Sequence, residues 1–382
     1  MRTVQPCTMI GAYGFEQDRV PRDEFQIRMA ALNAVMDRKG CKAMLVYGDA
    51  REHSELAYFT NFIPRHRWAL ALLPRQGDAR LLVSMSSRDM PAQRLMTWIP
   101  DVMSAWTWDK GFDQWLAGLI SGLGSDAAED IGTLRFDLMR SALLEATQKS
   151  LGNRFRLVAA DSDVAPLRAT RPRELSLIRE ACSIVGTAAE AFVQAWREGA
   201  GAEAAALAGE RAARGLAAQD VRSLVSFDGG RTLAPFRGTF EPQATSGSLL
   251  GYIAVKHKGY WAEAFVSAAN RPSDVHARAR AGLESALRAA GPGIRATDLH
   301  AQATRALGAS PLHPALSASV GRRIGFSLNE GGELRGDAPH ILAAGDVYAL
   351  HVGLRDPQGG AVASAMAAIT PQGCELLARS PE

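Results

Sequence analysis

The sequence has few cysteines and no long apolar run. Its four cysteines are far apart in the chain: Cys7, Cys41, Cys182 and Cys374. Such spacing predicts neither a disulfide framework nor a zinc site, and it favours a reducing compartment. Residues 1–21 hold no apolar segment of the kind found in secretory signals. Apolar stretches such as 68–74 are far shorter than the ~20 residues of a membrane span, so we expect a cytoplasmic protein that does not contact membranes.

The chain also lacks an excess of charge of either sign. It has 43 Lys and Arg against 40 Asp and Glu, a formal net charge of +3. This balance argues against a nucleic-acid partner, which attracts strongly basic surfaces. Hydrophobic residues make up 47% of the chain and charged residues 22%, a mixture typical of a soluble protein with a sizeable core. Its length of 382 residues predicts two or three domains of roughly 150 residues each.

The first part of the chain alternates between helical and strand patterns. Apolar residues recur at helical spacing over 23–40 and 113–123, and Gly40 is a natural end for the first helix. Short apolar runs beside turn residues predict strands at 43–47, 69–73, 80–84 and 133–136. This alternation is typical of an α/β layered domain.

A polar linker and an internal repeat organise the rest of the chain. The proline-containing segment 161–173 marks a boundary, and we predict two domains, 1–160 and 161–382. Two glycine-flanked helix starts, at Gly199 and Gly293, lie 94 residues apart, and each precedes a strand-rich stretch. This offset fits two halves of one domain, and the alternative is a pair of unrelated turns.

Five segments in the chain share their order and spacing with a known group of proteins. They are Pro166–Ala181, Gly259–Ser267, Gly321–Glu330, Leu342–Gly353 and Ile369–Gly373. Together they resemble the creatinase/prolidase/methionine aminopeptidase superfamily, and the resemblance covers about Arg22 to Leu377. It implies an α/β creatinase-like N-terminal domain followed by an α+β pita-bread domain with a pseudo-two-fold internal duplication. It also implies a homodimer.

The sequence departs from this superfamily at the metal ligands. Peptidases of the group hold two divalent metal ions with two Asp, one His and two Glu. The matching positions here are Tyr252 or Ala254, then Glu263, Arg322, His351, and Ser364 or one of its neighbours Ala363 and Ala365. Only Glu263 keeps a carboxylate, and an arginine among the ligands repels cations. We therefore predict no metal and no other cofactor.

Creatinase is the superfamily's example of catalysis without metal, but its residues are not reproduced here. Phe236 stands where creatinase has its catalytic His, and Asn329 stands where the superfamily has the His of a His-Glu pair. Creatine is therefore not the expected substrate.

Three residues are candidate catalytic groups. His351 is the candidate base, since an imidazole titrates near neutral pH, and Glu263 and Glu330 are its candidate carboxylate partners. The alternative for His351 is a half-buried histidine on a strand. The alternative for the two glutamates is ion pairing with Arg322 or Arg323, which fills the space that metal ions occupy in relatives.

Seven further residues are candidates for substrate binding. Arg322 and Arg323 can clamp a carboxylate or a developing oxyanion. The others border the pocket or reach a partner's site in the superfamily: Asp228, Arg237, Tyr252, Arg65 and Arg67. For Arg65 and Arg67 the alternative is an exposed charged loop.

Three functions remain open from the sequence. The first is a metal-independent enzyme that cleaves a C–N bond, by hydrolysis or elimination, in a small anionic nitrogen-containing substrate. The second is an inert pita-bread protein that binds a peptide or small ligand, and the third is an Xaa-Pro-type metallopeptidase with displaced ligands. A tight polar pocket favours the enzyme. A large apolar groove without a hydrogen bond between His351 and a carboxylate favours the binding protein.

Overall fold

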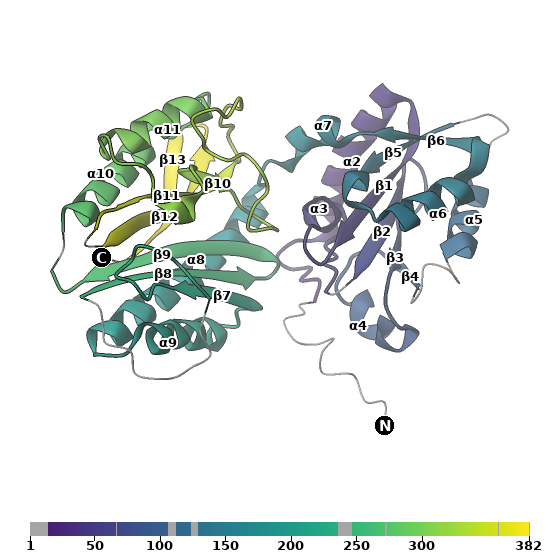
Figure 1. Cartoon of the computed structure of the whole chain (residues 1–382). Helices are drawn as coiled ribbons and strands as arrows, with labels where there is room; N and C mark the ends of the chain where they lie inside the picture. The colour runs from purple at the N-terminus through teal and green to yellow at the C-terminus, as the bar shows by residue number, and fades with distance from the viewer. Residues whose placement is uncertain are drawn as a thin grey trace. The chain divides into compact units, whose positions relative to one another are not determined.

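The chain folds into two compact units, Met1–Arg168 and Ala169–Glu382 (Figure 1). The structure is a computed structural model and describes residues 14–65, 67–105, 112–123, 129–235, 247–271, 273–357 and 359–381. The division comes after the boundary expected near residue 160. The short helix α7 (Asp161–Val164) belongs to the first unit, because Asp163 pairs with Lys39 at 2.7 Å and the Tyr58 hydroxyl donates to the carbonyl of Leu167 at 2.6 Å.

The first unit is an α/β layer structure built on one six-stranded sheet in the order β4-β3-β2-β1-β5-β6. Its strands are β1 (Cys41–Asp49), β2 (Trp68–Pro74), β3 (Arg80–Val83), β4 (Asp101–Ser104), β5 (Glu129–Leu134) and β6 (Phe155–Ala159). Its further helices are α2 (Arg22–Lys39), α3 (Ser54–Thr60), α4 (Met90–Arg94), α5 (Phe112–Leu123) and α6 (Ser141–Leu151). Single 3₁₀ turns lie at η1 (Ser87–Asp89), η2 (Phe136–Leu138), η3 (Gly152–Arg154) and η4 (Ala165–Arg168).

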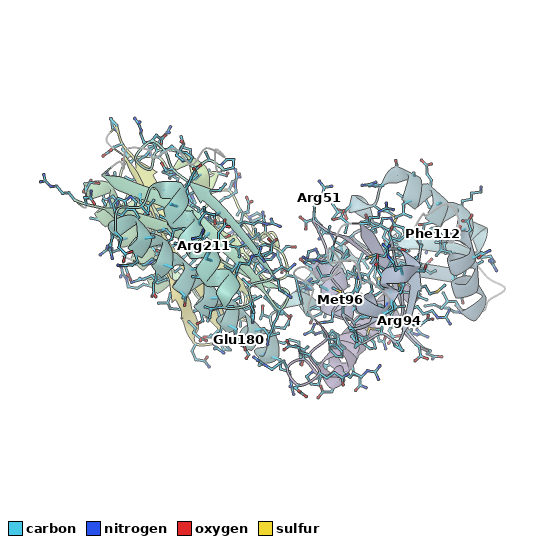
Figure 2. The ribbon with its side chains drawn as sticks, turned by 90° about the horizontal axis from the view of Figure 1, so that it is seen from below. Arg51, Arg94, Met96, Phe112, Glu180 and Arg211 are labelled. Atoms are coloured by element: carbon cyan, nitrogen blue, oxygen red, sulfur yellow. The ribbon has the colours of Figure 1, made fainter. Side chains whose placement is uncertain are left out.

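Local sequence and packing explain some of these boundaries. Helix α2 ends at Gly40, whose φ of 69° is the left-handed conformation that glycine adopts readily. The first residue of α5, Phe112, is fully buried, and its ring lies 6.1 Å from the ring of Trp68 on β2 (Figure 2). The expected strand at 133–136 is wrong in its bounds. Strand β5 ends at Leu134 because Arg135 takes a positive φ of 59° and turns the chain into η2.

The second unit consists of two antiparallel sheets and four helices among the described residues. One sheet is β7 (Asp220–Val225), β8 (Ser248–His257) and β9 (Tyr260–Ala269), and the other has the order β10-β11-β12-β13. The strands of the second sheet are β10 (Gly321–Arg323), β11 (Val347–Arg355), β12 (Gly360–Thr370) and β13 (Gly373–Arg379). The helices are α8 (Pro172–Arg197), α9 (Ala202–Gly215), α10 (Asp274–Ala289) and α11 (Ala296–Arg305), and a 3₁₀ turn, η5, spans Pro314–Leu316.

The second unit is internally duplicated, as the glycine spacing predicts. Two helices followed by three strands, α8 to β9, recur as α10 to β12, and β13 extends the second copy. Helix α9 begins at Ala202 and α11 at Ala296, which gives the 94-residue offset of the two glycine turns. The expected fold class, with an α/β unit before a duplicated α+β unit, is confirmed.

The two sheets of this unit meet along β9 and β12. The Phe265 amide on β9 donates to Ser364 Oγ on β12 at 2.8 Å, and Ser267 Oγ donates to the Val362 carbonyl at 3.0 Å. Elsewhere in this unit, Glu180 of α8, which Figure 2 labels, has Oε2 3.3 Å from Nε2 of the buried His257. Side chains on the inner faces of both sheets therefore converge where β9 and β12 run together. Within the described residues, no helix has the length and apolarity needed to cross a membrane.

Candidate functional site

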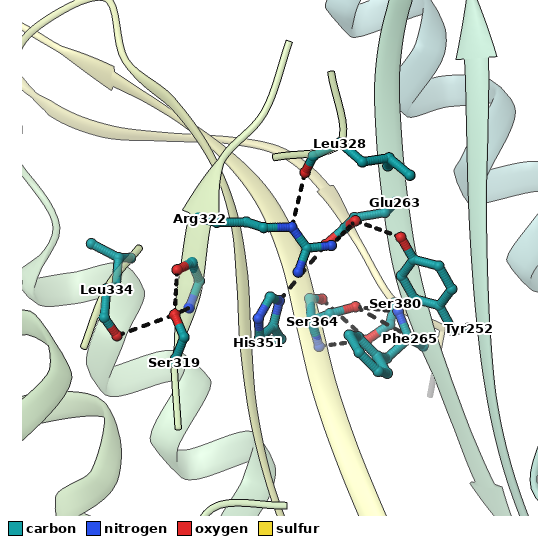
Figure 3. A network of polar contacts seen from close by, with 11 residues as sticks. Tyr252, Glu263, Phe265, Ser319, Arg322, Leu328, Leu334, His351, Ser364 and Ser380 are labelled. Carbon is teal, nitrogen blue, oxygen red and sulfur yellow. Dashed lines mark hydrogen bonds and ion pairs between the residues drawn. The ribbon is translucent and has the colours of Figure 1, made fainter. Parts of the chain in front are cut away.

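Five strands bring distant residues into one polar cluster in the second unit (Figure 3). Tyr252 lies on β8, Glu263 on β9, Arg322 on β10, His351 on β11 and Ser364 on β12. Strands β8, β9, β11 and β12 are mostly apolar and buried, so the cluster is a polar group among largely hydrophobic strands. We refer to these five residues as the central cluster.

Glu263 is the centre of the cluster. The Tyr252 hydroxyl donates a hydrogen bond to Glu263 Oε2 at 2.6 Å, and Arg322 Nη2 donates to the same oxygen at 2.6 Å. A further donor of Arg322, Nε, contacts the carbonyl of Leu328 at 2.9 Å. The guanidinium is therefore held on two sides. Glu263 is 3% exposed, so its charge depends on these partners.

His351 lies beside this ion pair without joining it by a hydrogen bond. Its Nδ1 atom is 3.8 Å from Glu263 Oε1, and the ring packs edge-on against Phe265 with centroids 5.4 Å apart. The 3.8 Å separation of Nδ1 and Oε1 is at least about 0.6 Å longer than a hydrogen bond between nitrogen and oxygen. Neither Nδ1 nor Oε1 has a hydrogen-bond partner among the described residues, and both atoms are buried.

Burial sets the protonation of the central cluster. It lowers the pKa of His351 to about 3, and the nearby Arg322 guanidinium lowers it in the same direction. Burial raises the pKa of Tyr252 well above its usual value, and the carboxylate of Glu263 adds to the shift. Burial also raises the pKa of Glu263, while Arg322 and Tyr252 act against that shift by donating to its charged form. His351 is therefore neutral at physiological pH.

The structure shows what the alternative residues at the first and last expected ligand positions contact. Tyr252 and Ala254 share one face of β8, and Ala254 pairs directly with Glu263, but only the tyrosine side chain reaches the carboxylate. On β12, Ser364 pairs directly with His351 and donates to the carbonyl of Phe265 at 3.4 Å. Of these alternatives, Tyr252 and Ser364 are the two that place a polar side chain in the central cluster.

Arg323 and Glu330 lie outside the cluster. Arg323 follows Arg322 on β10, so its side chain leaves from the opposite face and pairs with Asp346 at 3.2 Å. Glu330 Oε1 accepts hydrogen bonds from the amides of Phe326 at 2.7 Å and Ser327 at 3.3 Å, which fixes the carboxylate to its own loop.

Asp228 organises a turn at the edge of the site. Its carboxylate accepts from Ser226 Oγ at 2.8 Å, Thr232 Oγ1 at 2.8 Å and the amides of Arg231 and Thr232 at 3.0 Å each. Burial alone raises the pKa of Asp228, but these hydrogen bonds outweigh it and the pKa lies below its ordinary value. The carboxylate is thus occupied by the turn that carries Thr232 and Leu233.

The remaining three candidates are not among the described residues of the second unit. Arg237 lies outside the described residues. Arg65 and Arg67 belong to the first unit, in the loop between α3 and β2, whereas the central cluster belongs entirely to the second unit.

A cavity of about 490 Å³ borders the central cluster. Arg322, Tyr252 and Phe265 form its inner wall. The rest of the lining is Leu224, Thr232, Leu233, Pro314 and Ala315. The described part of the wall is mostly apolar, and Arg322 is its single charged side chain.

Sequence reasoning missed most of this wall. Phe265 could have been predicted, because it follows Glu263 by two residues on one strand and side chains two residues apart share a face. Pro314 and Ala315 had no such signal. They are placed by His313, a fully buried residue whose Nδ1 accepts from the Ala315 amide at 3.2 Å and whose Nε2 lies 2.8 Å from the carbonyl of Gly230.

The central cluster does not fit a pair of divalent metal ions. Its donors are one carboxylate, one neutral imidazole, a phenol and a hydroxyl, and the carboxylate is already bound by a guanidinium. Divalent ions in proteins require several anionic or imidazole ligands, and a fixed cation among them is repulsive. Within the described ranges, no three His, Cys, Asp or Glu side chains are grouped so that they could hold a metal.

Family models match both units. Residues 176–371 match metallopeptidase family M24, and residues 28–170 match the creatinase/prolidase N-terminal domain. The first match covers more than half of the chain, so this protein belongs to metallopeptidase family M24. A comparison with curated protein sequences gives no match.

Solved structures share the two-unit fold at low sequence identity. Prolidase from Pyrococcus horikoshii is 16% identical with a TM-score of 0.76, covering 93% of this chain and 99% of the other. X-Pro aminopeptidase from Thermotoga maritima is 19% identical with a TM-score of 0.74, covering 92% and 98%. The N-terminal domain of the FACT complex subunit SPT16 from chickpea, Cicer arietinum, is 14% identical with a TM-score of 0.66, covering 93% and 96%. The fold therefore occurs both in peptidases and in a subunit of a larger complex.

Proposed function

We propose that the second unit binds a small anionic compound at a site that works without metal ions. The observation that carries this proposal is the 2.6 Å contact between Arg322 and Glu263. The sequence resemblance matches these two residues to metal ligands of the superfamily. Arg322 supplies the fixed positive charge, and it also lines the cavity. A guanidinium binds carboxylates through directed, charge-assisted hydrogen bonds, so it replaces the electrostatic role of a metal without its Lewis acidity.

The geometry favours binding over turnover. A general base must reach the proton it removes and needs a pKa near the working pH. His351 is 2% exposed, its pKa is about 3, and its nearest carboxylate oxygen is 3.8 Å away. The cavity is also large and mostly apolar. These are the features that favour a ligand-binding protein.

The second candidate is metal-independent cleavage of a C–N bond by hydrolysis or elimination. It is favoured by the two buried atoms without a hydrogen bond, His351 Nδ1 and Glu263 Oε1, which face each other. Hydrogen bonds between catalytic groups are often long in a free enzyme and shorten when substrate binds. A movement of under about 1 Å would join the pair, and a carboxylate beside an imidazole raises its basicity.

Calorimetric titration separates the two candidates from a metal-dependent peptidase. Small carboxylates should bind the wild-type chain equally well before and after dialysis against a chelator, and Arg322→Gln should remove the binding. Loss of binding on chelation, restored by Mn²⁺, would refute metal independence. Chromatography of the ligand after prolonged incubation then decides between the candidates. Binding alone returns the ligand unchanged, whereas C–N cleavage yields products that disappear in His351→Gln.

A further inference from the structure

The cavity beside the central cluster carries a strong asymmetry of charge. Among the residues that the structure describes, Arg322 is its only charged lining residue, and no carboxylate contributes to the lining. We propose that its ligand is a compact apolar molecule with one carboxylate and an uncharged nitrogen, such as an amide, and that molecules with a free ammonium group are rejected. This inference rests on the proposed function above and names the class of compound that the site takes.

The carboxylate of the ligand is matched by Arg322. Its Nε donates to Leu328 and its Nη2 to Glu263, which leaves Nη1 with no hydrogen-bond partner among the described residues. The two contacts fix the plane of the guanidinium, and its side chain is 25% exposed. A fixed guanidinium with free N–H donors at a cavity wall is arranged to receive a carboxylate oxygen.

Within the described ranges, the cavity offers an ammonium group no equivalent partner. Glu263 Oε2 already accepts from Tyr252 and Arg322. Glu263 Oε1 has no hydrogen-bond partner among the described residues, but it is buried and lies 3.8 Å from His351 Nδ1. Asp228 is occupied by the four hydrogen bonds of its own turn. A charged amine placed in this cavity would lose water without gaining an anion, which is strongly unfavourable. An amide nitrogen loses far less on the same transfer.

The rest of the cavity accommodates an apolar body. Leu224, Leu233, Phe265 and the Pro314–Ala315 pair supply apolar walls. His313 connects the turn before Thr232 and Leu233 to the Pro314–Ala315 pair. Its ring contacts the Gly230 carbonyl in that turn and the Ala315 amide. A volume of about 490 Å³ lies within the range of small-molecule pockets. An acylated amino acid with an aliphatic or aromatic side chain has these properties.

Binding to matched sets of three compounds tests the inference on the wild-type chain. Each set holds an N-acyl amino acid, the same amino acid with a free amine, and the N-acyl amino acid amide. The sets combine acetyl or benzoyl groups with leucine, phenylalanine or proline. At least one N-acyl amino acid should bind with a Kd below roughly 1 mM, and its two counterparts should bind at least about tenfold more weakly.

Two variants assign the carboxylate contact. Arg322→Gln should weaken binding of the N-acyl amino acid by at least about tenfold. Arg323→Gln is the matched control and should leave binding of the N-acyl amino acid unchanged. Arg323 is as exposed as Arg322, but its side chain leaves the opposite face of β10. The comparison of compounds needs no variant, so it stands even where Arg322→Gln fails to fold.

Each result has a definite consequence. Equal or tighter binding of the free-amine compounds overturns the inference but leaves metal-independent binding intact. Equal binding of the amides shows that no carboxylate is recognised, and also overturns it. If no N-acyl amino acid binds, the inference fails. If binding occurs only with added Mn²⁺, it is the proposed function that fails.

Discussion

Two neighbouring arginines on one short strand have different environments. Arg322 and Arg323 each have a side chain that is 25% exposed, and each pairs with one carboxylate. Arg322 faces the cavity and binds Glu263, which is 2% exposed at its side chain, whereas Arg323 faces away and binds Asp346, which is 10% exposed. The alternation of a β-strand therefore assigns one arginine to the site and the other to the support of a loop.

The largest expected difference between the two pairs is in stability. Glu263→Ala leaves a guanidinium and a phenol without their buried acceptor, and should lower the free energy of unfolding by about 3–5 kcal/mol. Asp346→Ala removes a more exposed partner, and its loss should be smaller, about 1.5–3 kcal/mol. Urea unfolding of the wild-type chain and both variants measures these two losses in the free energy of unfolding. Equal losses would show that the two ion pairs are equivalent.

The second prediction concerns pH and uses His351, which faces Arg322, Glu263 and Tyr252. Its pKa is about 3 in the folded chain, against about 6.5 when unfolded. Below pH 6.5 only the unfolded chain binds the proton, so stability falls with falling pH down to about pH 3, by up to about 1.4 kcal/mol per pH unit. Above pH 6.5 both states are neutral and the effect is absent.

The contribution of His351 is isolated by comparison with His351→Gln. Between pH 7 and pH 5 the wild-type chain should lose about 2 kcal/mol more than this variant in urea unfolding. Other buried histidines affect both proteins alike. An identical pH dependence in the two would mean that His351 is accessible to protons, and would restore it as a candidate base.

The smallest expected effect is at Tyr252. Tyr252→Phe removes a buried hydrogen bond to Glu263 while keeping the ring, and should lower the free energy of unfolding by about 1–1.5 kcal/mol. The arginine contact with Glu263 remains, so ligand binding through Arg322 should persist. No change in stability would indicate that the 2.6 Å contact has no net value.

The fold was predictable because its signals are periodic and ordered along the chain. The 94-residue offset of two glycine turns and the order of five segments were enough to predict a duplicated second unit. Strand β5 was displaced because the left-handed conformation of Arg135 has no signature in a non-glycine residue.

The site was predictable only in part. Motif order indicated Glu263, Arg322 and His351 as neighbours, and the structure places all three in the central cluster. Treating Arg322 and Arg323 as one clamp ignored strand alternation, and loop length alone did not separate Tyr252 from Ala254. The wall formed by Pro314 and Ala315 depends on a long-range contact of His313, and sequence pattern carries no information about such a contact.

Metal analysis of the purified chain tests metal independence most directly. The chain is expressed with Mn²⁺, Co²⁺ and Zn²⁺ supplied, dialysed without chelator, and its metal content is measured by mass spectrometry. Because Arg322 binds the only carboxylate of the central cluster, we expect less than about 0.2 equivalents of divalent metal per chain. About two equivalents per chain would contradict this and would indicate a metallopeptidase with displaced ligands.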